Sequence, residues 1–156
     1  MAKLIALGAT ILALTATVLA SNDQPSNVEA RIQIVENISA FRAAHPELNL
    51  VPVESTRSPR QQILYTLGNR VSGDRLVAAD QNGQSWTTFQ DVALTLAYPQ
   101  SGVGAVISYI HVVVNQSSNL GRGYVVAGGI GQRYIQLVIE ASRTNYFNYD
   151  AQIYGK

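Results

Sequence analysis

The chain of 156 residues is long enough for one domain with a hydrophobic core, and it contains no cysteine. The missing thiols exclude disulfides, cysteine catalysis and Cys-ligated metal centres, so core packing and backbone pairing must hold the fold together. Eleven Lys or Arg residues against ten Asp or Glu residues give a net charge of +1. This balance lacks the concentrated positive charge that direct nucleic-acid binding requires, so we expect no nucleic-acid partner.

Residues 1–20, MAKLIALGATILALTATVLA, have the pattern of a secretory signal peptide. A single early cation, Lys3, precedes an uncharged apolar run, and small residues lead to a predicted cleavage between Ala20 and Ser21. The run is shorter than the ~20 residues that a membrane-spanning helix usually needs, and no basic cluster follows it. We therefore predict an extracellular mature chain without a membrane span.

Residues 21–62 form a charged leader that contains four of the five prolines. Its apolar residues recur at three- and four-residue steps, which predicts one amphipathic helix with Asn27 as N-cap and an end near Pro46: Val28, Ile32, Val35, Ile38 and Phe41. Arg31 and Arg42 fall within the same stripe and make it imperfect. A helix packed on the domain and a partly disordered leader both fit this pattern.

Other processing motifs accompany the signal. Arg57-Ser-Pro-Arg60 matches the minimal Arg-x-x-Arg pattern of secretory proprotein convertases, and cleavage after Arg60 would release the leader as a propeptide. The alternative is an ordinary exposed linker, which Pro59 beside the bond favours. Asn37 and Asn115 begin Asn-x-Ser glycosylation sequons, which have meaning only for a secreted chain.

Residues 63–156 change to a period of two, which is typical of half-buried strands. The alternation is clearest over residues 92–98, 135–140 and 147–154, whereas residues 105–114 are apolar on both faces and predict a central strand. Turn residues separate these segments at 68–69, 82–83, 99–102 and 118–119. We predict one mainly β domain over 63–156, an antiparallel β-sandwich or barrel.

The glycine-rich stretch GRGYVVAGGIG, residues 121–131, raises the question of a phosphate-binding loop. A Walker-type loop needs Lys and then Ser or Thr after its second glycine, but Gly129 and Ile130 follow Gly128. A strand pattern follows instead of the helix whose N-terminal amides would hold the anion. We interpret this stretch as a hairpin turn, and we predict turn roles for Gly68, Gly73, Gly128 and Gly129.

Few side chains suggest catalysis or metal binding. His45 and His111 lie in different regions, whereas a metal site needs several ligands in one cluster. The carboxylates of the β region are Asp74, Asp80, Asp91, Glu140 and Asp150. Solvated carboxylates near turns and on polar strand faces are the simpler interpretation, and a small hydrolase that pairs two of them is the alternative. We expect no catalytic residue, no metal and no cofactor.

Three segments carry a resemblance to a known family: TLGNRVSGDRLVAADQNG (residues 66–83), GYVVAGGIG (123–131) and FNYDAQIYG (147–155). Together they resemble the insect multiprotein bridging factor two family, which also includes response-to-pathogen proteins of caterpillar midgut. The most specific part is the pattern Gly-x-Arg-x-x-Gly-Asp-Arg at residues 68–75. The resemblance implies either a transcriptional co-activator or a secreted protein induced by feeding or infection, and it supplies no catalytic or metal-binding residues.

The signal and sequons favour a secreted, non-enzymatic protein that binds a protein or glycan partner in insect defence or stress. Eight tyrosines and Trp86 would suit such a binding face, although aromatic residues are also good strand formers. The alternative function is an intracellular transcriptional co-activator that bridges an activator to the general transcription machinery. An edge strand could also support a homodimer, and the sequence does not decide whether one forms.

Overall fold

The computed structural model describes residues 27–46, 51–52, 54–57 and 62–156. Its elements, in chain order, are β1 (Glu29–Val35), α1 (Ile38–Ala44), β2 (Val51–Pro52), β3 (Glu54–Arg57), β4 (Gln62–Gly68), β5 (Arg75–Tyr98), β6 (Ile107–Gln116), β7 (Gly121–Gly128) and β8 (Ile135–Gly155). The mainly β prediction is therefore confirmed. Within the described residues, no helix is long and apolar enough to cross a membrane.

The described strands join in one antiparallel sheet. Its order is β1-β5-β8-β6-β4-β3, and β7 also pairs with β8 and carries β2 on its other side. The predicted sandwich of two separate sheets, or a closed barrel, is not confirmed, because continuous strands connect the whole sheet. The prediction of a central strand at residues 105–114 is confirmed, because β6 lies between β4 and β8.

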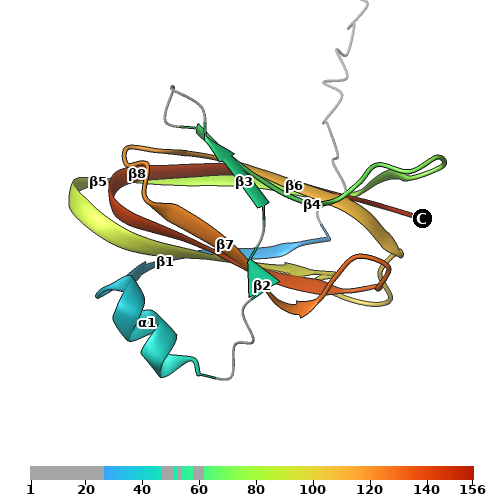
Figure 1. The fold of residues 1–156 in the computed structure, drawn as a ribbon, viewed down its shortest axis with the longest axis horizontal. Coiled ribbons are helices and arrows are strands. Elements are labelled where there is room, and N and C mark those ends of the chain that lie inside the picture. The colour runs from blue at the N-terminus through green and yellow to red at the C-terminus, as the bar shows by residue number, and fades with distance from the viewer. Residues whose placement is uncertain (1–26, 47–50, 53, 58–61) are drawn as a thin grey trace, which may run out of the picture.

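The two long strands, β5 and β8, divide the sheet into halves. Residues 135–141 of β8 lie between β7 and residues 92–98 of β5, and we call this part the β7 half. Residues 147–155 of β8 lie between β6 and residues 75–84 of β5, and we call this part the β6 half. Figure 1 shows β5 and β8 turning together at one end, so that the halves form two layers.

Irregular pairing and polar contacts shape this bend. The register of β5 against β8 shifts between Ser85 and Gln90 and again before Val92, and such bulges bend strands. On β8, Arg143 has φ of 54°, and its amide donates to Asp91 Oδ1 at 2.9 Å. The pairing continues past the bend. One strand, β8, therefore contains both segments that the sequence indicates as separate strands, 135–140 and 147–154.

The core lies between the two layers. Apolar side chains of the β7 half, such as Leu96 and Leu137, face Ile110, Val112 and Ile153 of the β6 half. All five are buried, so each Leu or Ile truncated to Ala would cost about 2–5 kcal/mol. The alternating apolar residues of the sequence thus belong to one inner face of the sheet. Both halves of the sheet share this face, because the sheet folds over on itself.

The predicted helix from Val28 to Phe41 is wrong in its first half. Residues 29–35 form β1, whose Ile32 and Ile34 lie opposite Leu94 and Val92 of β5. The same apolar residues satisfy a period of two, and pairing with an otherwise free edge of β5 outweighs the helical spacing. The N-cap is Asn37 instead of Asn27, since its Oδ1 accepts a hydrogen bond from the Ala40 amide at 2.6 Å.

The predicted turn at Asn82-Gly83 is also wrong, because both residues lie inside β5. Gly83 pairs with Asn148 of β8, and a Cβ at position 83 would lie 1.8 Å from Asn148 Oδ1. The missing side chain at Gly83 therefore leaves room for the amide of Asn148.

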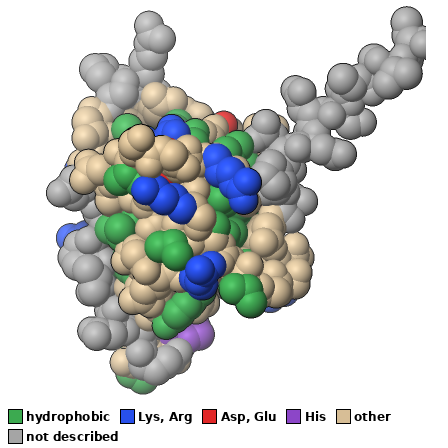
Figure 2. Space-filling model, turned by 90° about the vertical axis from the view of Figure 1, so that its right-hand side faces the viewer, with side chains coloured by type: hydrophobic (Ala, Val, Ile, Leu, Met, Phe, Trp, Pro, Cys, Tyr) green, Lys and Arg blue, Asp and Glu red, His purple; other side chains and the backbone are tan. Residues whose placement is uncertain are grey.

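Three loops meet at the end of the sheet opposite the bend, and we call this part the loop end. They comprise residues 69–74, 99–106 and 129–134. The Asn69 amide donates to Ser108 O at 3.1 Å, and the Gly131 amide donates to Ile107 O at 2.8 Å. Figure 2 views this end from the front, with Lys and Arg side chains set between hydrophobic ones.

Candidate functional site

Several predicted processing residues lie outside the described part of the chain: Ala20, Ser21 and Arg60. Arg57 is the last residue of β3, and its Nη2 donates to Gly121 O at 3.1 Å. Asn37 caps α1. Asn115 is exposed on β6, where its Oδ1 accepts from Gln62 Nε2 at 3.4 Å. Cleavage and glycosylation at these positions stay predictions.

The four glycines with predicted turn roles all have positive φ. The angles are 72° at Gly68, 82° at Gly73, 69° at Gly128 and 151° at Gly129. The Gly129 amide donates to Tyr134 O, and the chain continues into β8 instead of a helix. The stretch from 128 to 134 is thus a hairpin loop, which lacks the helix N-terminus of a phosphate site.

The segment Gly68–Arg75, the most specific part of the family pattern, folds around one ion pair. Arg70 Nη2 lies 2.8 Å from Asp74 Oδ1, and the Asp74 carboxylate also accepts from the Val71 amide and the Ser108 hydroxyl, each at 2.9 Å. The Asp74 side chain is 2% exposed. The Arg70 guanidinium, with the Val71 amide, holds the pKa of the Asp74 carboxyl well below its usual range.

Arg70 connects this loop to an aromatic cluster on the outer face of the β6 half. Its guanidinium carbon lies 3.7 Å from the centre of the Tyr154 ring, a cation–π contact. The rings of Tyr109, His111 and Tyr154 contact one another at centroid distances of 5.8–6.2 Å. The Tyr154 hydroxyl donates to Gln152 Oε1 at 2.7 Å.

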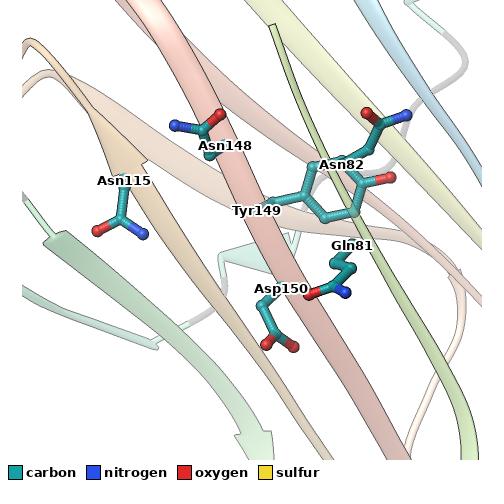
Figure 3. A pocket seen from close by; sticks show the side chains of 6 residues that line it. All are labelled: Gln81, Asn82, Asn115, Asn148, Tyr149 and Asp150. Carbon is teal, nitrogen blue, oxygen red and sulfur yellow. The ribbon is translucent and has the colours of Figure 1, made fainter. Parts of the chain in front are cut away.

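The aromatic cluster continues into a row of amides and one carboxylate along the same face. A shallow groove of about 350 Å³ is lined there by side chains from three strands, including Gln81, Asn115, Asn148 and Asp150 (Figure 3). We call this surface, from Tyr154 to Asn115, the open face, because its side chains are exposed or half-buried while alternate residues are buried. It offers many hydrogen-bond donors and acceptors beside aromatic rings that contact one another at an angle.

The outer face of the β7 half differs, because α1 lies against it. Arg42 of α1 donates from Nε to Glu140 Oε1 at 3.0 Å and from Nη2 to the Tyr124 hydroxyl at 2.6 Å. The Glu140 side chain is 4% exposed. Sequence reasoning missed this pair, because Arg42 and Glu140 come from distant segments and nothing in their local spacing relates them.

The described residues form no cluster of metal ligands. Throughout residues 27–46 and 62–156, no group of three His, Asp or Glu side chains gathers as metal ligands. His45 stacks on Phe41 at 4.7 Å, while His111 belongs to the open face, so the structure does not bring the two histidines together. The absence of catalysis and of cofactors stays a prediction.

These features define a mainly β protein whose folded sheet leaves one polar, aromatic face open. A family model described as "Transcription activator MBF2" matches residues 67–155, more than half of the chain. The protein therefore belongs to the MBF2 family, which confirms the resemblance to the multiprotein bridging factor two family. Comparisons with curated proteins and with solved structures found no match.

Membership of this family corrects the expected location. An extracellular, secreted protein was predicted from residues 1–20, but a transcription activator family points to an intracellular, nuclear location. Of the two functions that the sequence left open, the family favours the co-activator over the secreted defence protein.

Proposed function

We propose that this protein is a transcriptional co-activator that bridges an activator protein to the general transcription machinery by non-enzymatic protein–protein contacts. The observation that carries this proposal is the MBF2 match over residues 67–155. The matched segment includes most of the open face, the Arg70–Asp74 loop and both long strands.

The open face supports a bridging role through its chemistry. Tyr side chains give large contact area at low entropic cost, and both Tyr and Arg are enriched in protein interfaces. Tyr109, Tyr154 and Arg70 are already held by contacts with one another, so little side-chain freedom would be lost on binding. The amides of Asn115 and Asn148 add hydrogen-bonding specificity beside them.

Reporter transcription in cultured insect cells tests the proposal. The full chain, carrying a C-terminal tag, is co-expressed with a sequence-specific activator and a matching luciferase reporter, and its location is followed by microscopy and by fractionation of cells and medium. A double variant of the open face, His111→Ala with Asn148→Ala, is compared with Gln33→Ala plus Gln136→Ala on the other half of the sheet.

We expect nuclear protein, reporter activity that rises with co-expression, and loss of that rise in the open-face variant only. Recovery of the chain solely from the medium, or no effect on any activator tested, would overturn the proposal. An equal loss in both variants would remove the open face from the argument and leave the family match as its support.

A further inference from the structure

The loop end gathers four cations from different parts of the chain. Arg70 comes from the loop after β4, Arg75 begins β5, Arg133 comes from the β7–β8 hairpin, and Lys156 follows β8. The contacts that join the loops bring them to one end of the sheet. Val106 and Lys156 exchange backbone hydrogen bonds, and Arg133 Nη1 donates to Gly104 O at 3.0 Å.

Acidic residues hardly offset this charge. Asp74, the acidic side chain of these loops, is buried and already bound to Arg70, Val71 and Ser108. Arg75, Arg133 and Lys156 are all exposed, and Asp74 is the one acidic residue within the three loops. The nearest acidic residue of the described strands is Glu29 of β1, which pairs with Ala97 beside the 99–106 loop. The whole chain is nearly neutral, so this end is a local positive region produced by folding.

Exposed apolar side chains lie among these cations. The exposed fractions are 43% for Val71, 84% for Val103, 40% for Ile130 and 52% for Tyr134. Figure 2 shows hydrophobic side chains between the Lys and Arg side chains on this end. Apolar groups gathered on a surface and rimmed by polar ones indicate an interaction site.

The surface is also pre-organised. The 129–134 hairpin is fixed by the Gly131 amide on Ile107 O and by the Ile107 amide on Gln132 O, both at 2.8 Å. Ile130 packs beside Gly68, where an added Cβ would lie 2.7 Å from the Ile130 side chain. Loops that are already held pay less ordering entropy when a partner binds.

We propose that the loop end binds an acidic amphipathic peptide segment, in which Asp or Glu residues alternate with large apolar ones. Carboxylates would meet Arg75, Arg133 and Lys156, and the apolar residues would cover Val103 and Tyr134. A nucleic-acid backbone would use the cations but would leave the apolar side chains against a charged strand. The inference rests on the proposed function, because it names the chemistry of one bridged partner.

Fluorescence anisotropy with the purified chain tests this surface directly. The probe is a fluorescein-labelled synthetic peptide of alternating Asp or Glu and Leu, Phe or Trp residues. Two further probes separate the contributions: the same peptide with every apolar residue replaced by Ser, and a random-sequence DNA duplex. Circular dichroism and thermal unfolding check the fold of each variant.

Two variants carry the test, each with a matched control. Arg75→Glu plus Lys156→Glu reverses two charges of the loop end, and Arg31→Glu plus Arg143→Glu makes the same charge change on β1 and at the bend. Val103→Ser removes an exposed apolar side chain of the loop end, and Phe89→Ser removes one that is 65% exposed at the bend.

We expect the loop-end charge variant to weaken binding of the amphipathic peptide roughly tenfold, Val103→Ser to weaken it less, and both controls to leave it unchanged. Equal weakening by the controls, tighter binding of the duplex, or full affinity for the Ser-substituted peptide would each overturn the inference. The binding assay does not depend on transcription, so peptide binding without reporter activity would refute only the co-activator role. Reporter activity without peptide binding would refute only the inference that the loop end binds an acidic amphipathic peptide.

Discussion

Arg42 of α1 and Glu140 of β8 are 98 residues apart in the chain and form a two-bond ion pair on the outer face of the sheet. The Glu140 carboxylate is buried, whereas the Arg42 side chain is 36% exposed. The pair connects the short helix to β8, and the Tyr124 hydroxyl accepts a further hydrogen bond from Arg42.

Replacing Arg42 by Leu is expected to destabilise the protein by up to about 3 kcal/mol, because it leaves a buried carboxylate without its partner. This is the lower end of the range for broken buried pairs, since Arg42 is partly solvated. The double variant Arg42→Leu, Glu140→Leu should recover much of the loss. Urea unfolding of the wild type, both single variants and the double variant measures the coupling. If the unfolding free energies lost in Arg42→Leu and in Glu140→Leu simply add up in the double variant, the two side chains do not stabilise each other.

Asp74→Asn should destabilise the protein near neutral pH, and this effect should fade in acid. The pKa of the Asp74 carboxyl is lowered in the folded state, chiefly by Arg70 and then by the Val71 amide. A lowered pKa contributes stability above the unfolded-state value of about 3.9, and that stability is lost as the pH falls toward the folded-state value.

Unfolding free energies measured from pH 7 down to pH 3 check this prediction. Asp150→Asn is the control, because the Asp150 carboxylate accepts only a long hydrogen bond of 3.4 Å from Gln152. A stability gap between the wild type and Asp74→Asn that stays constant over the acid range would refute the assignment.

Tyr65 and Tyr149 should respond in opposite ways to loss of their hydroxyl groups. The buried Tyr65 hydroxyl has no hydrogen-bond partner among the described residues, so Tyr65→Phe should be neutral or slightly stabilising. The Tyr149 hydroxyl donates to Asp80, so Tyr149→Phe should cost about 1.5–3 kcal/mol. Equal losses in thermal or urea unfolding would contradict this contrast.

The same two rings predict behaviour in alkali. Burial raises the pKa of Tyr65 to about 12, and burial together with the Asp80 carboxylate raises that of Tyr149. A raised pKa contributes stability below the unfolded-state value of about 10, and that stability is lost as the pH rises through the folded-state value. Phenolate absorbance should therefore show these two tyrosines ionising late, together with unfolding, and Tyr65→Phe should remove one late step.

Gly68→Ala should destabilise the protein more than Gly73→Ala. Both glycines have positive φ, and placing alanine in this backbone conformation destabilises the folded state by about 1–2 kcal/mol. At Gly73 the new Cβ meets open space, but at Gly68 it would lie 2.3 Å from Ser108 O, a backbone atom that cannot turn away. Thermal unfolding of both variants compares the two costs directly, and similar melting temperatures would show that the close approach is relieved elsewhere.

Alternating residues by themselves predicted the strand content. Residues 92–98, 135–140 and 147–154 lie in strands, because alternating residue types within a strand show which of its faces is buried. The apolar segment at 105–114 contributes the central strand β6, but only the inner face of β6 is buried. The family pattern at residues 68–75 was likewise legible from the sequence, since it needs only residue types at fixed spacing.

Tertiary structure decided what local spacing could not. Residues 29–35 fit both a helix and a strand, and the unpaired edge of β5, about sixty residues away along the chain, selects the strand. Asn82-Gly83 has the composition of a turn, but pairing of these residues with Tyr149 and Asn148 of β8 continues the strand through them.

The candidate surfaces depend on the fold in the same way. Arg70 stacks on Tyr154, and the cations of the loop end come from three separate segments of the chain. A sequence determines which of its faces are buried, because that property belongs to neighbouring residues. Only the folded sheet determines which distant residues meet, because hydrogen-bonding partners, close approaches and paired charges are supplied by other parts of the chain.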